Sequence, residues 1–162
     1  MCAFFVSRET LGVTMKEYYM KEAIKEAEKA YNLDEVPIGA VIVYNAQIIA
    51  RSHNIKEKEK NPLCHAEIIA IDQACKKIGD WRLDECELYV TVEPCLMCCG
   101  AILHSRLRKV IYGASNTKFG YVESINKILT DPKNNHMVEV ESGICAEECQ
   151  KLMTNFFESK RK

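Results

Sequence analysis

The spacing of apolar side chains along the chain predicts helices that alternate with short buried strands. In residues 16–31, apolar side chains recur at intervals of three and four positions, which is typical of a helix buried along one face. Glutamate and lysine fill the remaining positions, and we interpret them as a solvated outer face. Residues 36–44 and 47–52 are apolar runs of strand length, and the short turn Asn45-Ala46 between them predicts a β-hairpin.

The rest of the chain continues as strands followed by helices, which predicts one sheet covered by helices. The expected elements are, in chain order, a helix at 16–31, strands at 36–44 and 47–52, a helix at 64–79, a strand at 87–93, a helix at 95–104, a strand at 110–113, a weak helical segment at 124–129, a strand at 138–140 and a helix at 146–160. This order favours a three-layer α/β/α domain around one mixed five-stranded sheet.

Two of the expected helices carry apolar stripes that identify the side chains expected to face the core. The stripe of the helix at 64–79 consists of Cys64, Ile68, Ile71, Cys75 and Ile78. The stripe of the final helix consists of Leu152, Phe156 and Phe157.

Length and charge limit the domain organisation and the class of partner. A chain of 162 residues corresponds to about one domain. Residues 1–14 lack a clear period, so we expect a poorly ordered N-terminal extension followed by a single domain at 15–162. No apolar run approaches the roughly 18 residues of a membrane span, so no membrane contact is expected. The formal net charge is −1, so binding to nucleic acid would require a local basic patch.

The nine cysteines are not expected to form a disulfide framework. Their number is odd, the chain is longer than disulfide-stapled miniproteins, and no signal peptide is visible. Cys64 and Cys75 fall on a helix stripe, where cysteine acts as a small hydrophobic residue. A reducing cytoplasm is therefore the expected location.

Two short motifs predict the ligands of a catalytic zinc site. Cys95 and Cys98 open a helix directly after a strand, where Pro94 stops the strand and the positive helix end favours thiolates. His65 provides a third ligand, and Glu67 lies two residues beyond it in the first turn of another helix. Three protein ligands leave one zinc position open for water, as in hydrolytic sites.

Two other uses of these residues are less well supported. A closed structural zinc site would require Cys64 or Cys99 as a fourth ligand, but each adjoins another ligand and Cys64 is expected to be buried in its helix. A thioredoxin-like redox pair would explain neither His65 nor Glu67.

These motifs resemble the zinc-dependent nucleoside and base deaminases, whose signature combines His-x-Glu with Pro-Cys-x-x-Cys. From Met15 onward the chain is most similar to the bacterial tRNA-specific adenosine deaminases. Beyond the zinc motifs, the similar segments are 35–41, Asn54, Pro62, 100–106, 112–114, Lys118 with Gly120, 135–136 and the Phe156-Phe157 pair. The resemblance implies a cytidine-deaminase-like fold with one zinc ion per subunit.

The resemblance also implies the reaction. His65, Cys95 and Cys98 would hold zinc, which lowers the pKa of water from 15.7 towards about 7. Glu67 would act as general acid and base while water replaces the amino group at C6 of adenine, which yields inosine.

The implied substrate is the wobble adenosine in the anticodon stem-loop of a tRNA, bound by a homodimer. Asn54 would contact the nucleoside, while Val36 and the backbone of Ala66 would border the base. The residues implied to face the RNA are His104, Ser105, Arg106, the 114–120 loop with Asn116 and Lys118, and the basic tail of Lys160, Arg161 and Lys162. Lysine and arginine suit phosphate contact.

Departures from the family pattern leave two alternatives open. Asn116 stands where the bacterial enzymes usually carry Asp, Leu63-Cys64 replaces Thr-Ala, and bulkier residues occupy 119 and 121–123. The nearest alternative is a deaminase of free bases or nucleosides such as guanine, cytosine or cytidine. The other is a non-catalytic, deaminase-like subunit that binds RNA, although the presence of Glu67 argues against it.

Overall fold

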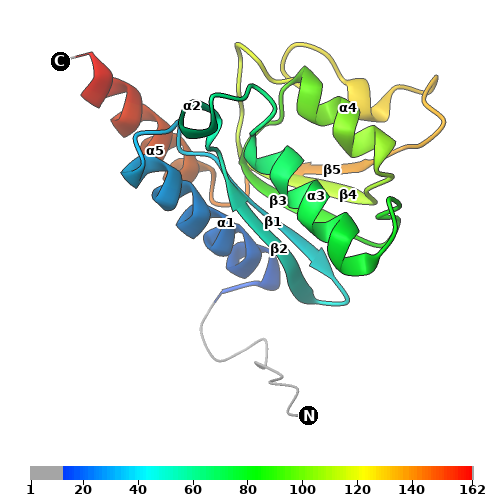
Figure 1. Cartoon of the computed structure of the whole chain (residues 1–162). Coiled ribbons are helices and arrows are strands. Elements are labelled where there is room, and N and C mark those ends of the chain that lie inside the picture. Colours follow the sequence, from blue (N-terminus) through cyan, green and yellow to red (C-terminus); the bar gives the residue numbers. More distant parts are fainter. Residues whose placement is uncertain (1–12, 162) are drawn as a thin grey trace.

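The computed structural model describes residues 13–161 and shows one mixed five-stranded sheet between two layers of helices (Figure 1). The strands are β1 (Gly39–Tyr44), β2 (Gln47–His53), β3 (Glu87–Val92), β4 (Lys109–Ala114) and β5 (Glu139–Ser142), in the spatial order β2-β1-β3-β4-β5. The strand β1 is antiparallel to β2 and β3, whereas β3, β4 and β5 are parallel to one another. The expected three-layer fold is confirmed.

The helices divide between the two faces of the sheet. On one face lie α1 (Met15–Asn32) and α5 (Ala146–Lys160), and on the other lie α3 (Ala66–Ile78) and α4 (Leu96–His104) (Figure 1). The short helix α2 (Lys56–Glu59) and the 3-10 turn η1 (Ile128–Thr130) complete the regular structure. No helix in residues 13–161 is long and apolar enough to cross a membrane.

Alternation along the strands produces two separate apolar cores. Ile42 and Leu88 face α3 and α4, whereas Val41 and Tyr89, their neighbours in sequence, face α1 and α5. Successive strand residues point to opposite faces, so a strand buried on both sides must be apolar throughout. This explains why the strand patterns are continuous apolar runs.

The first helix is capped by Thr14, a residue that the sequence pattern placed in the N-terminal extension. The Thr14 hydroxyl accepts a hydrogen bond from the Glu17 amide at 3.2 Å, which satisfies a free N–H of the first turn. Residues 1–12 and 162 lie outside the described part, so the proposed extension at 1–14 stays largely a prediction.

The solvated outer face expected for α1 is wrong for two of its carboxylates. Glu22 and Glu26 form the i, i+3 pairs with lysines, but both are buried. Each also binds a residue of β2, since Glu22 contacts Arg51 at 2.6 Å and Glu26 contacts His53 at 2.9 Å. The sequence period could not reveal this, because the partners belong to an edge strand that folds back beside the helix.

The apolar stripe expected for α3 is right only in part, because Ile71 and Cys75 pack at the border of the core. The buried face of α3 consists of Ala66, Glu67, Ala70 and Ala74, and none of the five predicted stripe residues is fully buried. Small side chains let the helix lie close to the sheet, which leaves the larger isoleucines at the borders of the contact. Cys64 precedes the helix and is half-buried.

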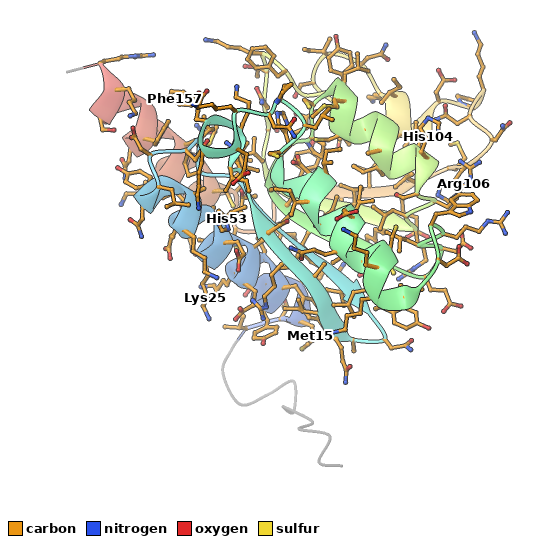
Figure 2. All side chains as sticks on the ribbon, in the orientation of Figure 1. Met15, Lys25, His53, His104, Arg106 and Phe157 are labelled. Atoms are coloured by element: carbon orange, nitrogen blue, oxygen red, sulfur yellow. The ribbon has the colours of Figure 1, made fainter. Side chains whose placement is uncertain are left out.

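Several element boundaries differ from those predicted. The strand predicted from 36 begins at Gly39, α2 occupies part of the charged segment expected as a loop, and the helical turn expected at 124–129 lies at η1. The last strand, expected at 138–140, is β5. The final helix has the expected bounds, but Phe157 is 43% exposed and points away from the core (Figure 2).

Candidate active site

One edge of the sheet collects all the segments that carry candidate site residues. The pairings Gly39 with His53, Ala40 with Val90 and Val92 with Ala114 place the start of β1 and the ends of β2, β3 and β4 at this edge. Ligand sites of open α/β sheets usually lie outside the carboxyl ends of their strands. The N-terminal ends of α3 and α4 also lie here, as Figure 1 shows.

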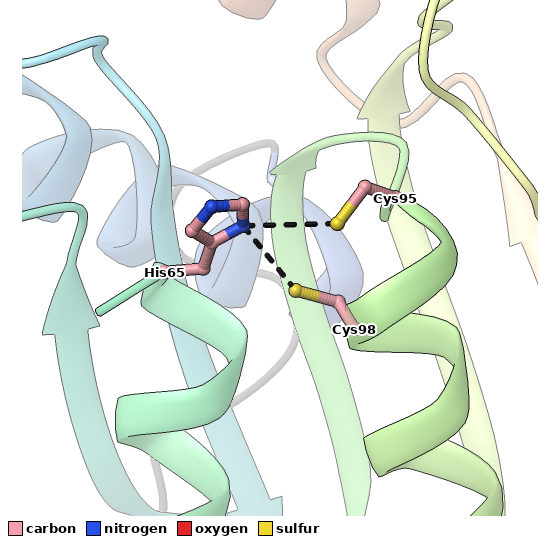
Figure 3. Close-up of side chains that lie close together, drawn as sticks. All are labelled: His65, Cys95 and Cys98. Atoms are coloured by element: carbon pink, nitrogen blue, oxygen red, sulfur yellow. Dashed lines mark hydrogen bonds between the residues drawn. The ribbon is translucent and has the colours of Figure 1, made fainter. Parts of the chain in front are cut away.

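His65, Cys95 and Cys98 converge at this edge from the two helix starts (Figure 3). His65 occupies the N-cap position of α3, and Cys95 occupies the N-cap position of α4. The Nδ1 atom of His65 lies 3.7 Å from Sγ of Cys95 and 3.6 Å from Sγ of Cys98. The histidine is thereby brought to two cysteines that are 30 or more residues away in sequence.

These donors have the chemistry and spacing of a zinc site. A tetrahedral zinc with Zn–S near 2.3 Å and Zn–N near 2.05 Å separates N and S by about 3.6 Å, which agrees with both observed distances. The three ligand atoms all lie within 4.8 Å of one another. Neither Cys64 nor Cys99 belongs to this group, and the Cys99 thiol instead donates to the Pro94 carbonyl.

The hydrogen bond between Cys95 and Cys98 shifts the pKa values of the two thiols in opposite directions. The hydrogen bond from Cys98 is the strongest influence on Cys95 and, with that from His65, lowers the pKa of Cys95 to about 4 despite burial. The same hydrogen bond raises the pKa of Cys98, and burial adds to this effect. The pair thus shares one proton that a divalent cation would displace, as metal binding to thiols requires.

Glu67 stands beside the ligands as a buried carboxyl with an unusual environment. Its side chain is 3% exposed, and Oε2 has no hydrogen-bond partner among the described residues. Burial raises the pKa of Glu67 to about 7. A carboxyl that titrates near neutrality can both accept and donate a proton, as a general acid and base must. Its unpaired oxygen suits a group that acts on substrate and water rather than on the fold.

Asn54 contacts Val36, and Ala66 directly follows the ligand His65. The Asn54 amide donates to the Val36 carbonyl at 3.2 Å, and its oxygen accepts from the Lys56 amide at 3.1 Å. The next residue of this segment, Ile55, donates its amide to the carbonyl of Cys64, directly before His65. Ala66 is buried, and its carbonyl accepts a hydrogen bond from Ser52.

The segment that carries Asn116 and Lys118 forms a loop, residues 115–125, around a buried carboxylate. The Asn116 side-chain oxygen accepts from the amides of Lys118 and Phe119, so it shapes the loop from within. Glu93 lies at the centre, and the sequence motifs did not single it out. Its one signal was a charged residue at the end of an apolar strand, directly before Pro94.

The residues at the C-terminal end of α4 separate into one buried and two accessible side chains. Ser105 is buried and donates its hydroxyl to the Ile102 carbonyl, so the expectation that it faces RNA is wrong. His104 and Arg106 lie at the surface side of this end (Figure 2). At 1.5 Å per residue, His104 is about 13 Å along the helix axis from Cys95, so it lies away from the metal ligands.

The basic tail lies at the end of α5. Lys160 forms an ion pair with Asp34, just beyond the end of α1, and lies over the Phe156 ring. Arg161 is exposed, and Lys162 lies outside the described residues. Neither Lys160 nor Arg161 is among the residues that meet at the metal ligands.

The family follows from comparison with known proteins. The MafB19-like deaminase family model matches residues 14–161. The tRNA-specific adenosine deaminase of Bacillus subtilis is 50% identical over 150 residues, which span 93% of this chain and 93% of the relative. The chain belongs to the tRNA-specific adenosine deaminase family. The family member of Aquifex aeolicus is 44% identical over 90% of this chain and 96% of its own length.

Solved structures agree with this assignment. A structure from a study of A-to-I editing by tRNA:A34 deaminases at the wobble position has a TM-score of 0.80 and 41% identity, and the match covers 83% of this chain and 98% of that one. A guanine deaminase from Nitrosomonas europaea has a TM-score of 0.75, with 86% of this chain and 83% of that one covered. It is only 21% identical, so it shows that the fold is shared and no more.

Proposed function

We propose that this protein hydrolyses the wobble adenosine of a tRNA anticodon to inosine, with zinc and Glu67 at the reacting centre. The observation that carries the proposal is the convergence of His65, Cys95 and Cys98 beside a buried Glu67, in a chain that belongs to this family. The reaction consumes water and adenosine and releases inosine and ammonia.

His65, Cys95 and Cys98 would hold the metal, because their spacing matches tetrahedral zinc with one position left over. Bound zinc supplies Lewis-acid chemistry that lowers the pKa of water from 15.7 towards about 7. Glu67 accepts the proton of the attacking water and transfers it to the adjacent ring nitrogen as a C–O bond forms at C6. Glu67 then takes the proton of the new C6 hydroxyl group and passes it to the amino group. The C6–N bond breaks, which leaves the C6 carbonyl of inosine and releases ammonia.

The pocket walls hold the adenosine in place for this attack. Asn54 sits between Val36 and the start of α2, where its amide group would hydrogen bond with the nucleoside. Val36 and the backbone of Ala66 border the base. The adenosine must unstack from its neighbours to reach the metal ligands. The free-energy cost is small because bases of the anticodon loop are unpaired.

RNA contact outside the pocket is proposed for accessible basic and polar side chains. Asn116 and Lys118 belong to the loop that borders the metal ligands, and His104 and Arg106 lie at the far end of α4. Lys160 and Arg161 extend the same role to the end of α5. The lysines and arginines of this set would neutralise phosphates locally, as a chain with a net charge of −1 requires.

We further propose that the protein is a homodimer. The large apolar residues of α3 are not fully buried, and Ile78 and Leu96 are among the exposed large hydrophobic residues. Covering such residues is a common reason for subunits to associate. Sedimentation equilibrium across a concentration series tests this, and a mass of one chain at every concentration would contradict it.

The cytoplasm is the proposed location. The cysteines of residues 13–161 are free thiols, and four of them belong to or adjoin the metal ligands in sequence. A reducing compartment keeps such thiols available.

The deciding experiment incubates zinc-loaded protein with total tRNA and sequences the anticodon loops, where inosine is read as G. We expect conversion at the wobble position of a tRNA that carries A there. Parallel reactions measure ammonia release from guanine, cytosine and cytidine. Activity on the free bases alone would show that the protein is a small-molecule deaminase, and inactivity of zinc-loaded protein on every substrate would indicate a non-catalytic subunit.

A further inference from the structure

The carboxylate of Glu93 is the centre of a hydrogen-bonded loop, and neither metal binding nor proton transfer explains it. Glu93 follows β3 and precedes Pro94-Cys95, and its side chain is buried. Oε1 accepts the amides of Glu123 and Ser124 at 2.7 and 2.8 Å. Oε2 accepts the Asn116 amide at 2.9 Å and the Ser124 hydroxyl. Both oxygens are therefore engaged by residues 23 or more positions along the chain.

The loop at 115–125 is built to close around this carboxylate. An ideal Cβ at Gly120 would lie 2.3 Å from both Cδ and Oε2 of Glu93, so only glycine fits beside the group. The Gly120 amide donates to the Asn116 carbonyl, and its own carbonyl accepts the amide of Ile125. The loop thus folds tightly on itself with the carboxylate inside.

The same loop is tied to the metal-ligand turn. The Tyr121 amide donates to the carbonyl of Pro94 at 3.0 Å, and the Glu93 amide donates to the Ala114 carbonyl at 2.8 Å. Pro94 directly precedes Cys95. The outer side of the loop presents Lys118 and Phe119, and Phe119 is 66% exposed.

We propose that Glu93 is a positioning residue that acts on RNA binding through the 115–125 loop. It holds this loop in a fixed position relative to the metal ligands, so that Lys118 and Phe119 contact the anticodon loop. This inference rests on the proposed function. Glu93 touches neither substrate nor metal; it acts through the loop. Phosphate and an unstacked base are the partners that a lysine and an exposed aromatic ring fit.

The role requires a carboxylate, because every hydrogen-bond partner of its oxygens is a donor. In Glu93→Gln, one oxygen becomes an NH₂ group that must face either the amides of Glu123 and Ser124 or the amide of Asn116. The hydrogen bonds to one of the two oxygens are lost, while the shape of the side chain remains. The loop should then move as a unit, and the turn at Cys95 should stay in place.

The test compares the zinc-loaded wild type, Glu93→Gln and the control Glu22→Gln. Glu22 is also a buried carboxylate that accepts hydrogen bonds, in its case from Lys25 and Arg51. It lies on α1, away from the 115–125 loop. With an anticodon stem-loop that carries A at the wobble position, we expect Glu93→Gln to raise KM about tenfold or more, with kcat within about threefold. Zinc content should stay at one per chain, and hydrogen exchange should speed up at residues 115–125 only. Glu22→Gln should keep both kinetic constants.

Each outcome decides between the claims. Loss of zinc in Glu93→Gln, or a fall in kcat at unchanged KM, overturns the positioning role and makes Glu93 a support of the metal site. Kinetics equal to those of Glu22→Gln overturn it as well. If Glu93→Gln does not fold, Ser124→Ala removes one donor and should raise KM about twofold to fivefold, and an unchanged KM counts against the inference. If the wild type itself does not edit the stem-loop, the proposed function is wrong, and this inference falls with it.

Discussion

At the scale of single residues, adjacent side chains of one type have different tasks. Cys98 lies in the metal group, whereas Cys99 is buried against the Pro94 carbonyl. Glu67 and Glu93 are both buried carboxylates, but one has an oxygen without a partner among the described residues and the other has both oxygens occupied. Burial alone therefore does not identify a catalytic group. The oxygen without a partner is what distinguishes Glu67, the carboxylate proposed to react, from Glu93.

Replacing the catalytic carboxyl should separate metal binding from turnover. Glu67→Gln keeps the volume of the side chain but cannot carry a proton, so we expect inosine formation to fall by about 10²-fold or more. Zinc content, measured by atomic emission on purified protein, should remain at one per chain. Near-normal turnover would remove Glu67 from this role.

The neighbouring cysteines provide a matched pair for the metal site. Cys98→Ser should lose zinc, because the serine hydroxyl is a poor ligand compared with a thiolate. Cys99→Ser should retain zinc, since its side chain donates to a carbonyl and serine can do the same. Metal content after dialysis against a weak chelator distinguishes the two variants. Equal retention in both would argue against Cys98 as a ligand.

At the scale of elements, close packing of helices against the sheet explains where small residues occur. Gly39 begins β1 directly beneath α1, where an ideal Cβ would lie 2.0 Å from the Ala23 carbonyl oxygen and 2.4 Å from the Ala27 nitrogen. Alanines serve the same purpose along the buried face of α3. Such contacts hold α1 and α3 close against the two faces of the sheet.

A methyl group at Gly39 should push α1 away from the sheet. Both clashing atoms belong to the backbone, so they cannot move aside cheaply, and we expect Gly39→Ala to lower the free energy of unfolding by about 1–3 kcal/mol. Gly100→Ala in α4 is the control, because an ideal Cβ at Gly100 would meet no neighbouring atom of the described residues within 4 Å. That change should leave stability equal or raise it by up to about 1 kcal/mol. Urea unfolding measures both, and an undiminished stability of Gly39→Ala would contradict the packing argument.

At the scale of the whole molecule, two buried carboxylates of α1 fasten the edge strand β2 to that helix. Glu22 accepts from Lys25 and from Arg51, and Glu26 binds His53. Arg51 and His53 both belong to β2, and His53 pairs with a residue of β1 at the site edge. The attachment of β2 to α1 therefore depends on charge, and the stability of the fold should depend on pH.

The sign of this dependence follows from the pKa of Glu22. Burial acts to raise it, but the hydrogen bonds from Lys25 and Arg51 outweigh burial and lower the pKa below its ordinary value of 4.5. A carboxyl with a lowered folded-state pKa stabilises the fold above about pH 4.5, and this contribution disappears as the pH falls through the folded-state pKa.

The wild type should therefore exceed Glu22→Gln in the free energy of unfolding by about 1–2 kcal/mol at pH 7. The difference should shrink below about pH 4.5, the ordinary pKa of the carboxyl. Urea titrations of both proteins from neutral pH to about pH 3 measure it, and acid-induced loss of metal affects both proteins alike. A difference that stays constant or grows with acid would contradict the linkage.

The local spacing of residues was enough to predict which side chains form the candidate metal group. His65 and Glu67, and Cys95 and Cys98, lie within single helix starts, where sequence separation translates directly into position. Continuous apolar runs likewise predicted the strands, because a strand covered on both faces has no polar side. The five-stranded three-layer fold and the metal-ligand set followed from these local patterns and from the family resemblance.

Only the tertiary structure decided which distant groups meet. The carboxylate of Glu93 binds the 115–125 loop, Glu22 binds Arg51, and Ser105 turns inward, because periodicity within one segment reports a face but not what covers it. The α3 stripe was predicted only in part for the same reason, since close packing on the sheet placed the alanines at the centre of the contact and Ile71 and Cys75 at its border. Long-range contacts depend on which elements lie side by side, and that is a property of the assembled sheet.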